Sequence, residues 1–174
     1  MSDVSIRPAG PQDIPAITRI YADAVDHGTA TFEIEPPDAA EMARRQQALL
    51  VNDLPYVVVE QAGIIAGYAY AGRYHARPAY RWSLEDTIYV APVFHRRGLG
   101  RLLMTRLIAE AEARGFRQMI AVIGDSANAG SIGLHAAVGF HPIGTLRSVG
   151  FKHGRWLDAV LMQCPLGSAD TTPP

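Results

Sequence analysis

Hydrophobic and polar positions change their period several times along the chain, and each change marks a predicted element. Alternation with β-branched and aromatic residues predicts strands, whereas apolar residues three and four positions apart predict helices. The predicted strands are Val4–Arg7, Tyr56–Glu60, Ile64–Tyr70, Trp82–Val90, Met119–Ile123, Ile143–Val149 and Trp156–Met162. The predicted helices begin after Asp13, run from Asp38 to about Val51, continue from Leu99 past Leu107, and cover Ser131–Val138.

The starts and ends of these elements carry local signals. Asp13 stands just before an apolar helical pattern, so we expect its side chain to cap that helix. Asp38 and Glu41 have the spacing of a capping box, and Gln-Ala-Gly after the second strand predicts a hairpin turn. Because strands and helices are mixed without a repeat or a linker, we expect one α/β domain over residues 1–166, with a sheet covered by helices. We expect the small, polar residues 167–174 to be a disordered tail.

Composition narrows the class of protein. Hydrophobic residues make up 48% of the 174 residues and charged residues 19%, as in an ordinary globular domain with a sizeable core. The net charge of −1 gives no overall field that favours nucleic acid or an anionic membrane. The single cysteine, Cys164, excludes an internal disulfide and a cysteine-cluster zinc site and fits a reducing compartment. With no apolar run that spans a bilayer and no signal-peptide pattern, we expect a cytoplasmic protein without a metal site.

The segment between the fourth strand and the following helix has the character of an anion site. His95–Gly100 is basic and contains glycine, and it leads into a helix N-terminus, where backbone N–H groups lack intrahelical partners. Glycines let a phosphate approach the backbone, and arginines add charge. A solvated basic turn is the alternative interpretation, since neither the Rossmann nor the P-loop pattern is complete. The residues of this predicted phosphate cradle are Arg96, Arg97, Gly98, Leu99, Gly100 and Arg101.

The Gly98-x-Gly100 pattern after a strand resembles the central motif of the GNAT superfamily of acyl-CoA-dependent N-acetyltransferases, with His95 where that motif has Gln or Arg. The order of elements is similar over nearly the whole chain. The resemblance implies a mixed, mostly antiparallel, twisted sheet flanked by helices, whose splayed central strands form an acyl-CoA cleft. It also implies acetyl-CoA as cosubstrate, with its pyrophosphate on the cradle. The implied backbone contacts to the pantetheine arm are at Ile88, Tyr89 and Val90.

A second motif lies in the helix after the fifth strand. Asn128, Ser131 and His135 are spaced to share one helix face. Taken alone, they also fit a cap, a first-turn hydroxyl and a packed histidine. GNAT enzymes are similar in this stretch, which implies acetyl-CoA contacts for Asn128 and Ser131. His135 replaces a tyrosine that in many members protonates the departing CoA thiolate, so the resemblance implies the same role for His135.

Two adjacent carboxylates, Glu85 and Asp86, enter a strand that is expected to be central, where charge is costly. Alternation places them on opposite sides, with Glu85 on the side of Thr87 and Tyr89. Acetylation of an amine requires removal of a proton from the ammonium. A carboxylate whose pKa is raised by partial burial is a suitable acceptor.

Longer matches narrow the resemblance to one subfamily, the phosphinothricin and methionine sulfoximine/sulfone N-acetyltransferases. The matching segments are Thr31–Pro37, Trp82–Val90, 115–124 and 150–158. This resemblance implies that Glu85 is the catalytic base. It also implies direct transfer, in a ternary complex, to the α-amino group of a small amino-acid analogue, and a homodimer whose C-terminal strands meet.

Such substrates carry a carboxylate and further oxygen acceptors, which require positive or hydrogen-bonding side chains. The loop Arg73–Arg81 supplies donors, although basic loop residues are usually solvated. Phe32 and Glu33 are candidates for closing the pocket, and Phe151–His153 for lining it from a neighbouring subunit. The predicted substrate-binding residues are Phe32, Glu33, Arg73, Tyr74, His75, Arg77, Glu85, Lys152 and His153.

Two other functions stay open at this point. A GNAT enzyme could acetylate a peptide N-terminus or a polyamine instead, although the basic loop Arg73–Arg81 disfavours a polycation. A non-catalytic acyl-CoA sensor would keep the cradle, but it would not need Glu85, Asn128 and His135. Cys164 is not expected to carry the acyl group, because no histidine stands beside it in sequence.

Overall fold

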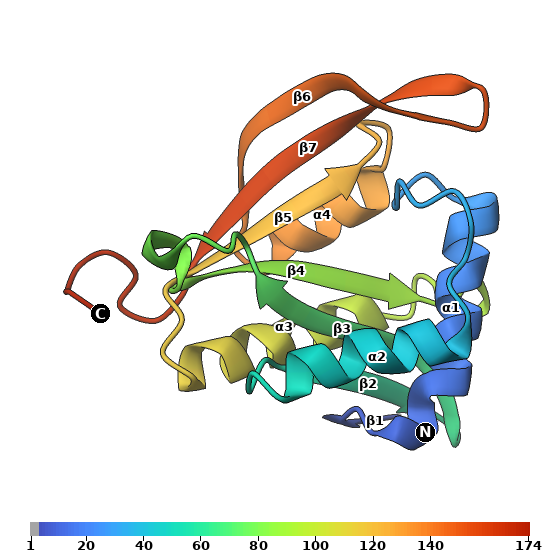
Figure 1. Ribbon diagram of the computed structural model, residues 1–174, viewed down its shortest axis with the longest axis horizontal. Helices are drawn as coiled ribbons and strands as arrows, with labels where there is room; N and C mark the ends of the chain where they lie inside the picture. Colours follow the sequence, from blue (N-terminus) through green and yellow to red (C-terminus); the bar gives the residue numbers. More distant parts are fainter. Residues whose placement is uncertain (1–3) are drawn as a thin grey trace.

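The computed structural model describes residues 4–174, which form seven strands and four α-helices (Figure 1). The strands are β1 (Val4–Pro8), β2 (Tyr56–Gln61), β3 (Ile64–Arg73), β4 (Ser83–Val90), β5 (Gln118–Gly124), β6 (His141–Lys152) and β7 (Arg155–Pro165). The helices are α1 (Ile14–His27), α2 (Ala39–Leu50), α3 (Leu99–Ala113) and α4 (Ala129–Ala137). Three short 3-10 helices cover Pro11–Asp13, Pro78–Tyr80 and Pro92–Phe94.

All strands belong to one sheet in the order β1-β2-β3-β4-β5-β7-β6. Neighbouring strands are antiparallel except for β4 and β5, which run parallel. This central pair is in register only where Ser83–Glu85 meet Gln118–Ile120. Beyond Glu85 the two strands diverge, so the sheet is split at its centre. The predicted mixed, mostly antiparallel sheet with splayed central strands is confirmed.

The inner strands are buried on both faces, and alternation divides their side chains between two cores. On one face, Val57, Val59 and Leu84 pack with α3 and α4. On the other face, Tyr56, Val58 and Tyr68 pack with α1 and α2. Each helix contributes an apolar stripe, such as Ile14, Ile17, Ile20, Tyr21 and Val25 of α1. The split between β4 and β5 therefore opens between two packed layers.

At the N-termini of α1 and α2, the capping interactions differ from those expected. Asp13 precedes α1, but its carboxylate accepts hydrogen bonds from Arg7 and from the Gly10 N–H, and caps no N–H of the helix. A bidentate arginine competes successfully for both carboxylate oxygens. At α2, Asp38 Oδ1 accepts the Glu41 N–H at 2.8 Å, as expected. The Glu41 carboxylate instead binds Arg44 and Arg45, so only half of the capping box forms among the described residues.

The remaining elements agree with the sequence pattern, with longer closing strands than expected. The hairpin turn between β2 and β3 has Ala62 and Gly63 at positive φ (53° and 75°), as a tight two-residue turn requires. The segment 167–174 lies against Arg117, which donates to the Ala169 carbonyl and the Thr172 hydroxyl; its disorder stays a prediction. Among residues 4–174, no helix has both the length and the apolar character to cross a bilayer.

Candidate active site

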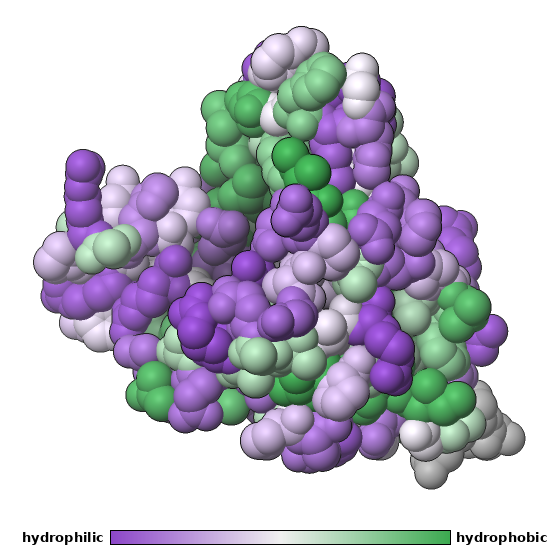
Figure 2. Space-filling model, turned by 45° about the vertical axis from the view of Figure 1, so that its right-hand side comes forward, coloured by the Kyte–Doolittle hydropathy of each residue, from purple (hydrophilic) through white to green (hydrophobic). Residues whose placement is uncertain are grey.

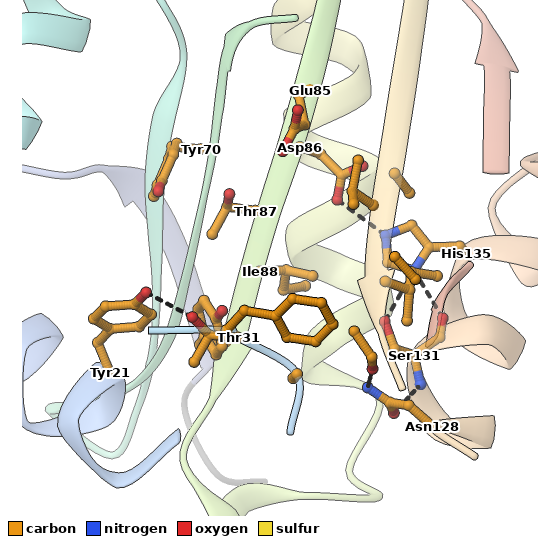
Figure 3. A pocket seen from close by; sticks show the side chains of 18 residues that line it. Tyr21, Thr31, Tyr70, Glu85, Asp86, Thr87, Ile88, Asn128, Ser131 and His135 are labelled. Carbon is orange, nitrogen blue, oxygen red and sulfur yellow. Dashed lines mark hydrogen bonds and ion pairs between the residues drawn. The ribbon is translucent and has the colours of Figure 1, made fainter. Parts of the chain in front are cut away.

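A cavity of about 290 Å³ occupies the split between β4 and β5. It is closed on one side by residues 30–32 of the loop between α1 and α2, and on another by the first turns of α4 (Figure 3). The polar or titratable side chains that line it are Tyr21, Thr31, Tyr70, Glu85, Asp86, Thr87, Tyr89, Asn128, Ser131 and His135. The cavity therefore brings together polar side chains from five separate stretches of the chain.

The two faces of β4 give the cavity two chemically different sides. Glu85, Thr87 and Tyr89 project toward the α1 and α2 layer, where Tyr89 packs on Tyr21 at 5.1 Å between ring centroids. Asp86 and Ile88 project toward the α3 and α4 layer. Because the strands diverge, both sides reach the same cavity. A substrate on one side can meet a cosubstrate on the other.

Glu85 is a half-buried carboxylate without a hydrogen bond or ion pair among the described residues. Burial, and then the neighbouring charge of Asp86, raises its pKa above the ordinary value of 4.5. A carboxylate with a raised pKa and no cationic partner is suited to accept a proton from a substrate. The environment of Glu85 is thus compatible with its predicted role as the base that takes a proton from the substrate amine.

Asp86 forms a buried pair with His135 of α4 (Figure 3). His135 Nε2 lies 2.9 Å from Asp86 Oδ2, and both side chains are only 2% exposed. His135 Nδ1 lies 2.7 Å from the Ser131 carbonyl oxygen, which can only accept. Burial by itself would lower the pKa of His135, but the hydrogen bond and charge of Asp86 outweigh it and raise that pKa. Asp86 was not among the site residues predicted from the sequence.

The first turn of α4 places two further predicted residues at the cavity. Asn128 is the N-cap, and its Oδ1 accepts the Ser131 N–H at 3.1 Å. The Ser131 hydroxyl lies 3.3 Å from His135 Nδ1 and lines the cavity. Asn128, Ser131 and His135 are therefore on one side of the helix, as their spacing predicted.

The cradle at the start of α3 offers free backbone donors. The N-cap Gly98 has no side chain to bond the first turn, and its φ of 80° is the left-handed conformation that glycine tolerates. Among the described residues, no acceptor is found for the N–H groups of residues 99–101, which precede the first α3 bond from Leu102 to Gly98. A Cβ on Gly100 would lie 3.1 Å from Leu134 of α4. These features fit the phosphates of acetyl-CoA, with the exposed Arg96 and Arg101 beside them.

His95 and Arg97 are tied to the end of β4 and the 3-10 helix after it. His95 Nε2 donates to the Val90 carbonyl at 2.8 Å, which gives the unusual first residue of the motif a structural bond. Arg97 donates to the Val93 carbonyl at 2.9 Å and lies over the Phe94 ring. Between Asp86 and Val90 the β4 edge facing β5 has no strand partner in the part of the chain that the structure describes. That edge leaves backbone groups at Ile88–Val90 available to an extended ligand.

On the side of the cavity formed by the α1–α2 loop, Phe32 and Glu33 were predicted from the sequence, whereas Tyr21, Thr31 and Tyr70 were not. The Tyr21 hydroxyl bonds Thr31 at 2.9 Å and donates to Glu33 at 2.8 Å, and Arg45 also binds Glu33. Burial raises the pKa of Tyr21 to about 12, so its hydroxyl stays protonated. Tyr70 lies opposite Thr87 on the neighbouring strand. Tyr70 could have been found from the sequence by pairing β3 with β4, because residues directly opposite each other point to the same face of the sheet.

Of the predicted substrate residues, Phe32 and Glu85 line the cavity. Lys152 and His153 contact the α1–α2 loop of their own chain. Lys152 Nζ donates to the Thr31 carbonyl at 3.0 Å, and the His153 ring donates to the Gly28 carbonyl at 3.2 Å. The ends of β6 and β7 therefore hold the loop that closes the cavity. Glu33 also stabilises this loop, because it accepts a hydrogen bond from the Tyr21 hydroxyl, which in turn contacts Thr31.

The residues of the basic loop before β4 do not line the cavity. Arg73 donates to the Arg81 carbonyl at 2.6 Å and lies over the Phe116 ring. The rings of Tyr74 and His75 contact each other at a tilt of 46°, with their centroids 4.2 Å apart. Arg77 is exposed at the start of the 3-10 helix Pro78–Tyr80. A role for these four residues in substrate binding stays a prediction.

The chain is similar in sequence and in fold to known acetyltransferases. A model of the acetyltransferase (GNAT) family matches residues 17–140. A phosphinothricin N-acetyltransferase of Alcaligenes faecalis is 52% identical over 170 residues, which is 98% of this chain and 86% of that protein. An L-methionine sulfoximine/L-methionine sulfone acetyltransferase of Pseudomonas aeruginosa is 38% identical, over 97% of this chain and 98% of that one. The crystal structure of a GNAT superfamily phosphinothricin acetyltransferase from Sinorhizobium meliloti, in complex with AcCoA, has 45% identity and a TM-score of 0.95, and the match covers 98% of this chain and 92% of that one.

Proposed function

Since the chain belongs to the acetyltransferase (GNAT) family, we propose that it transfers the acetyl group of acetyl-CoA to the α-amino group of a small amino-acid analogue. The substrates proposed are phosphinothricin, methionine sulfoximine and methionine sulfone, after the names of its relatives. The observation that carries the proposal is the cavity between β4 and β5. On one side it has the carboxylate of Glu85, which has no partner in the described part of the chain, and on the other the α4 N-terminus with polar side chains.

Acetyl-CoA supplies an activated acyl group, and the chain supplies its binding and the movement of protons. The backbone N–H groups of residues 99–101, with Arg96 and Arg101, hold the phosphates. The unpaired β4 edge at Ile88–Val90 binds the pantetheine arm and directs N–H groups at the thioester carbonyl. Asn128 at the α4 N-terminus lies toward the reacting end.

On the opposite side, Glu85 accepts a proton from the substrate ammonium through a water molecule. Its raised pKa makes it a stronger base than an exposed glutamate, and no cationic partner among residues 4–174 holds it in the ionised form. The ring of Phe32 and the Thr31 hydroxyl close the cavity over the amine. Their position depends on the hydrogen bond from Lys152 to the Thr31 carbonyl.

The test of substrate class is release of CoA thiol with phosphinothricin, methionine sulfoximine, methionine sulfone, spermidine and a short peptide offered in parallel. We expect saturable turnover with the three amino-acid analogues only. Turnover with the peptide or spermidine alone would move the protein to another branch of the family. No turnover with any of them, together with a melting temperature raised by acetyl-CoA, would favour an acyl-CoA sensor.

We also propose a cytoplasmic homodimer in which the β6–β7 hairpins of two copies meet. Five large apolar side chains on these strands are 49–64% exposed; they are Ile143, Leu146, Val149, Phe151 and Trp156. Figure 2 shows apolar side chains gathered on the projecting part of the molecule, above a mostly polar body. Because β6 is an edge strand, a second copy can cover this surface. Sedimentation of the wild type and of Val149→Glu would reveal whether the dimer forms there.

A further inference from the structure

The Asp86–His135 pair leaves one polar atom unexplained. Asp86 Oδ2 binds His135, whereas Asp86 Oδ1 is buried without a hydrogen-bond partner among the described residues. A buried carboxylate oxygen that accepts no hydrogen bond lowers the stability of the fold. Its presence therefore suggests that the charge of Asp86 has a functional role. The pair lies at the wall of the cavity, on the side of β4 opposite Glu85. A structural ion pair would not need to be placed there.

The bonding of His135 sets its protonation state. The Ser131 carbonyl is an acceptor only, so His135 Nδ1 carries a proton. An ionised Asp86 is also an acceptor only, so Nε2 carries a proton as well. His135 is therefore an imidazolium whose two N–H groups both point at fixed acceptors. It has no third proton to present directly to a ligand in the cavity.

The Ser131 hydroxyl is the group that connects the pair to the cavity. Its Oγ lies 3.3 Å from His135 Nδ1, beside the shorter bond from that nitrogen to the Ser131 carbonyl. Both residues line the cavity, but Ser131 is half-buried, whereas the His135 side chain is only 2% exposed (Figure 3). Ser131 also stands in the first turn of α4, where the helix dipole favours a negative charge.

We propose that Asp86, His135 and Ser131 form a proton relay in which the Ser131 hydroxyl, and not His135 itself, protonates the departing CoA sulfur. This inference rests on the proposed function and deepens it. As the amine nitrogen bonds the acetyl carbon, the carbon–sulfur bond breaks and its electron pair goes to sulfur, while the nitrogen, now cationic, gives its extra proton to a water molecule. The Ser131 O–H proton passes to sulfur, and the His135 Nδ1 proton passes to Ser131 Oγ. His135 regains a proton from solvent after the products leave. Asp86 is a positioning residue that holds His135 protonated.

The first test follows His135 itself, in the protein without ligands, by NMR titration of its imidazole. Its signal is identified by its loss in His135→Gln. The other titratable groups within electrostatic reach of Asp86 are Glu85 on β4 and Cys164 on β7; burial, and in addition the charge of Asp86, raises the pKa of both. We expect Asp86→Asn to lower the pKa of His135, and Asp53→Asn, an exposed carboxylate change, to leave it unchanged. An unchanged His135 pKa in Asp86→Asn would overturn the role of Asp86.

The second test is the titration of the thiol of bound CoA, followed by the ultraviolet absorbance of the thiolate. A donated hydrogen bond and a nearby cation both stabilise the thiolate. We expect Ser131→Ala and Asp86→Asn to raise the pKa of the bound thiol, and Ser131→Thr, which keeps the hydroxyl, to restore it. An equal thiol pKa in the wild type and Ser131→Ala would overturn the relay. This titration needs CoA binding but no turnover, so it separates a failed relay from a failed acetyltransferase assignment.

The third test is the split between kcat and KM in the acetyl transfer reaction. Loss of the acid should lower kcat by roughly 10²-fold in Ser131→Ala, a usual contribution of general acid catalysis, with the KM for acetyl-CoA little changed. Ser126→Ala is the matched control, because Ser126 binds Asp158 outside the cavity. If Ser131→Ala kept the wild-type kcat while His135→Gln lost it, His135 would be the direct donor and the relay would be wrong.

Discussion

The two faces of β4 give two neighbouring carboxylates different environments. Glu85 and Asp86 are adjacent carboxylates, yet within residues 4–174 Glu85 has no hydrogen-bond or ion-pair partner, whereas Asp86 is bound to a buried imidazolium. Alternation sends Glu85 toward the tyrosine-rich layer of α1 and Asp86 toward α4. The unpaired carboxylate is free to take up a proton during the reaction. The paired one keeps its charge and fixes the charge of its neighbour.

This difference shows how one strand can serve two substrates. On the Glu85 side the wall is aromatic and closed by a loop, which suits a small amine. On the Asp86 side the wall is a helix N-terminus with a cap and a hydroxyl, which suits a leaving group that becomes negative. The divergence of β4 and β5 joins both sides in one cavity. Changes on either side should therefore have separable effects.

The largest effect is expected from Glu85→Gln. Removal of the base should lower kcat/KM for the amine by roughly 10²–10⁴-fold, with binding of acetyl-CoA unchanged in calorimetry. In the wild type, kcat/KM should rise with pH through the raised pKa of Glu85, because only the ionised form accepts a proton. That rise should be absent in Glu85→Gln.

Glu110→Gln is the matched control for this change. Glu110 binds Arg106 and Arg114 on the outer side of α3, away from the cavity. Full turnover by Glu85→Gln, with the pH dependence of the wild type, would mean that another group accepts the amine proton.

The next effect is a loss of stability in Asp86→Ala. This change leaves His135 as a buried cation without its partner and should lower the free energy of unfolding by about 3–5 kcal/mol. Because Asp86 raises the pKa of His135, the folded chain binds this proton more tightly than the unfolded chain. Its contribution is complete below the ordinary pKa of 6.5 and is lost as pH rises through the higher folded value. Urea denaturation at a series of pH values measures both effects.

In Asp86→Asn the fall in stability above pH 6.5 should largely disappear, since the histidine no longer has an anionic partner. A wild-type stability that rises over this pH range, or the same fall in both proteins, would contradict a charged Asp86–His135 pair.

A smaller effect is expected where β6 holds the loop that closes the cavity. Lys152 is the only lysine in the chain, and Lys152→Met removes its hydrogen bond to the Thr31 carbonyl while keeping its apolar stem. The loosened loop should raise the KM for the amine by roughly tenfold, about 1.4 kcal/mol, without changing the affinity for acetyl-CoA. Steady-state kinetics with each substrate varied in turn measures the difference. Arg147→Met, at an exposed residue of the same strand that binds Asp158, should behave as the wild type.

The smallest effects are expected from replacing two glycines on the side of the cavity proposed to bind acetyl-CoA. Gly133→Ala in α4 meets open space at an exposed helical position and should stabilise the protein by about 0.5–1 kcal/mol. Gly100→Ala at the start of α3 would press on Leu134 at 3.1 Å and should weaken binding of acetyl-CoA. Thermal unfolding and calorimetry measure the pair. Equal affinity for acetyl-CoA in the two variants would show that the close approach at Gly100 is not needed for binding.

Much of the fold followed from local pattern. The strand before Pro92, the helix that begins at Leu99 and the hairpin before Ile64 each carry a period or a turn signal that nearby residues decide. The expected cap by Asp13 failed, because Arg7 on β1 approaches its carboxylate from a strand that no local signal places there. The length of β6 and β7 likewise depends on their pairing with each other.

The sequence by itself determined the elements of this protein, its family motifs and the alternation that separates Glu85 from Asp86, because these are properties of neighbouring residues. Only the tertiary structure decided which carboxylate is paired, since His135 stands 49 residues from Asp86 along the chain and meets it across two layers. It also decided that Lys152 supports Thr31 from 121 residues away. Pairings of this kind depend on how the sheet and helices pack, and no local period encodes them.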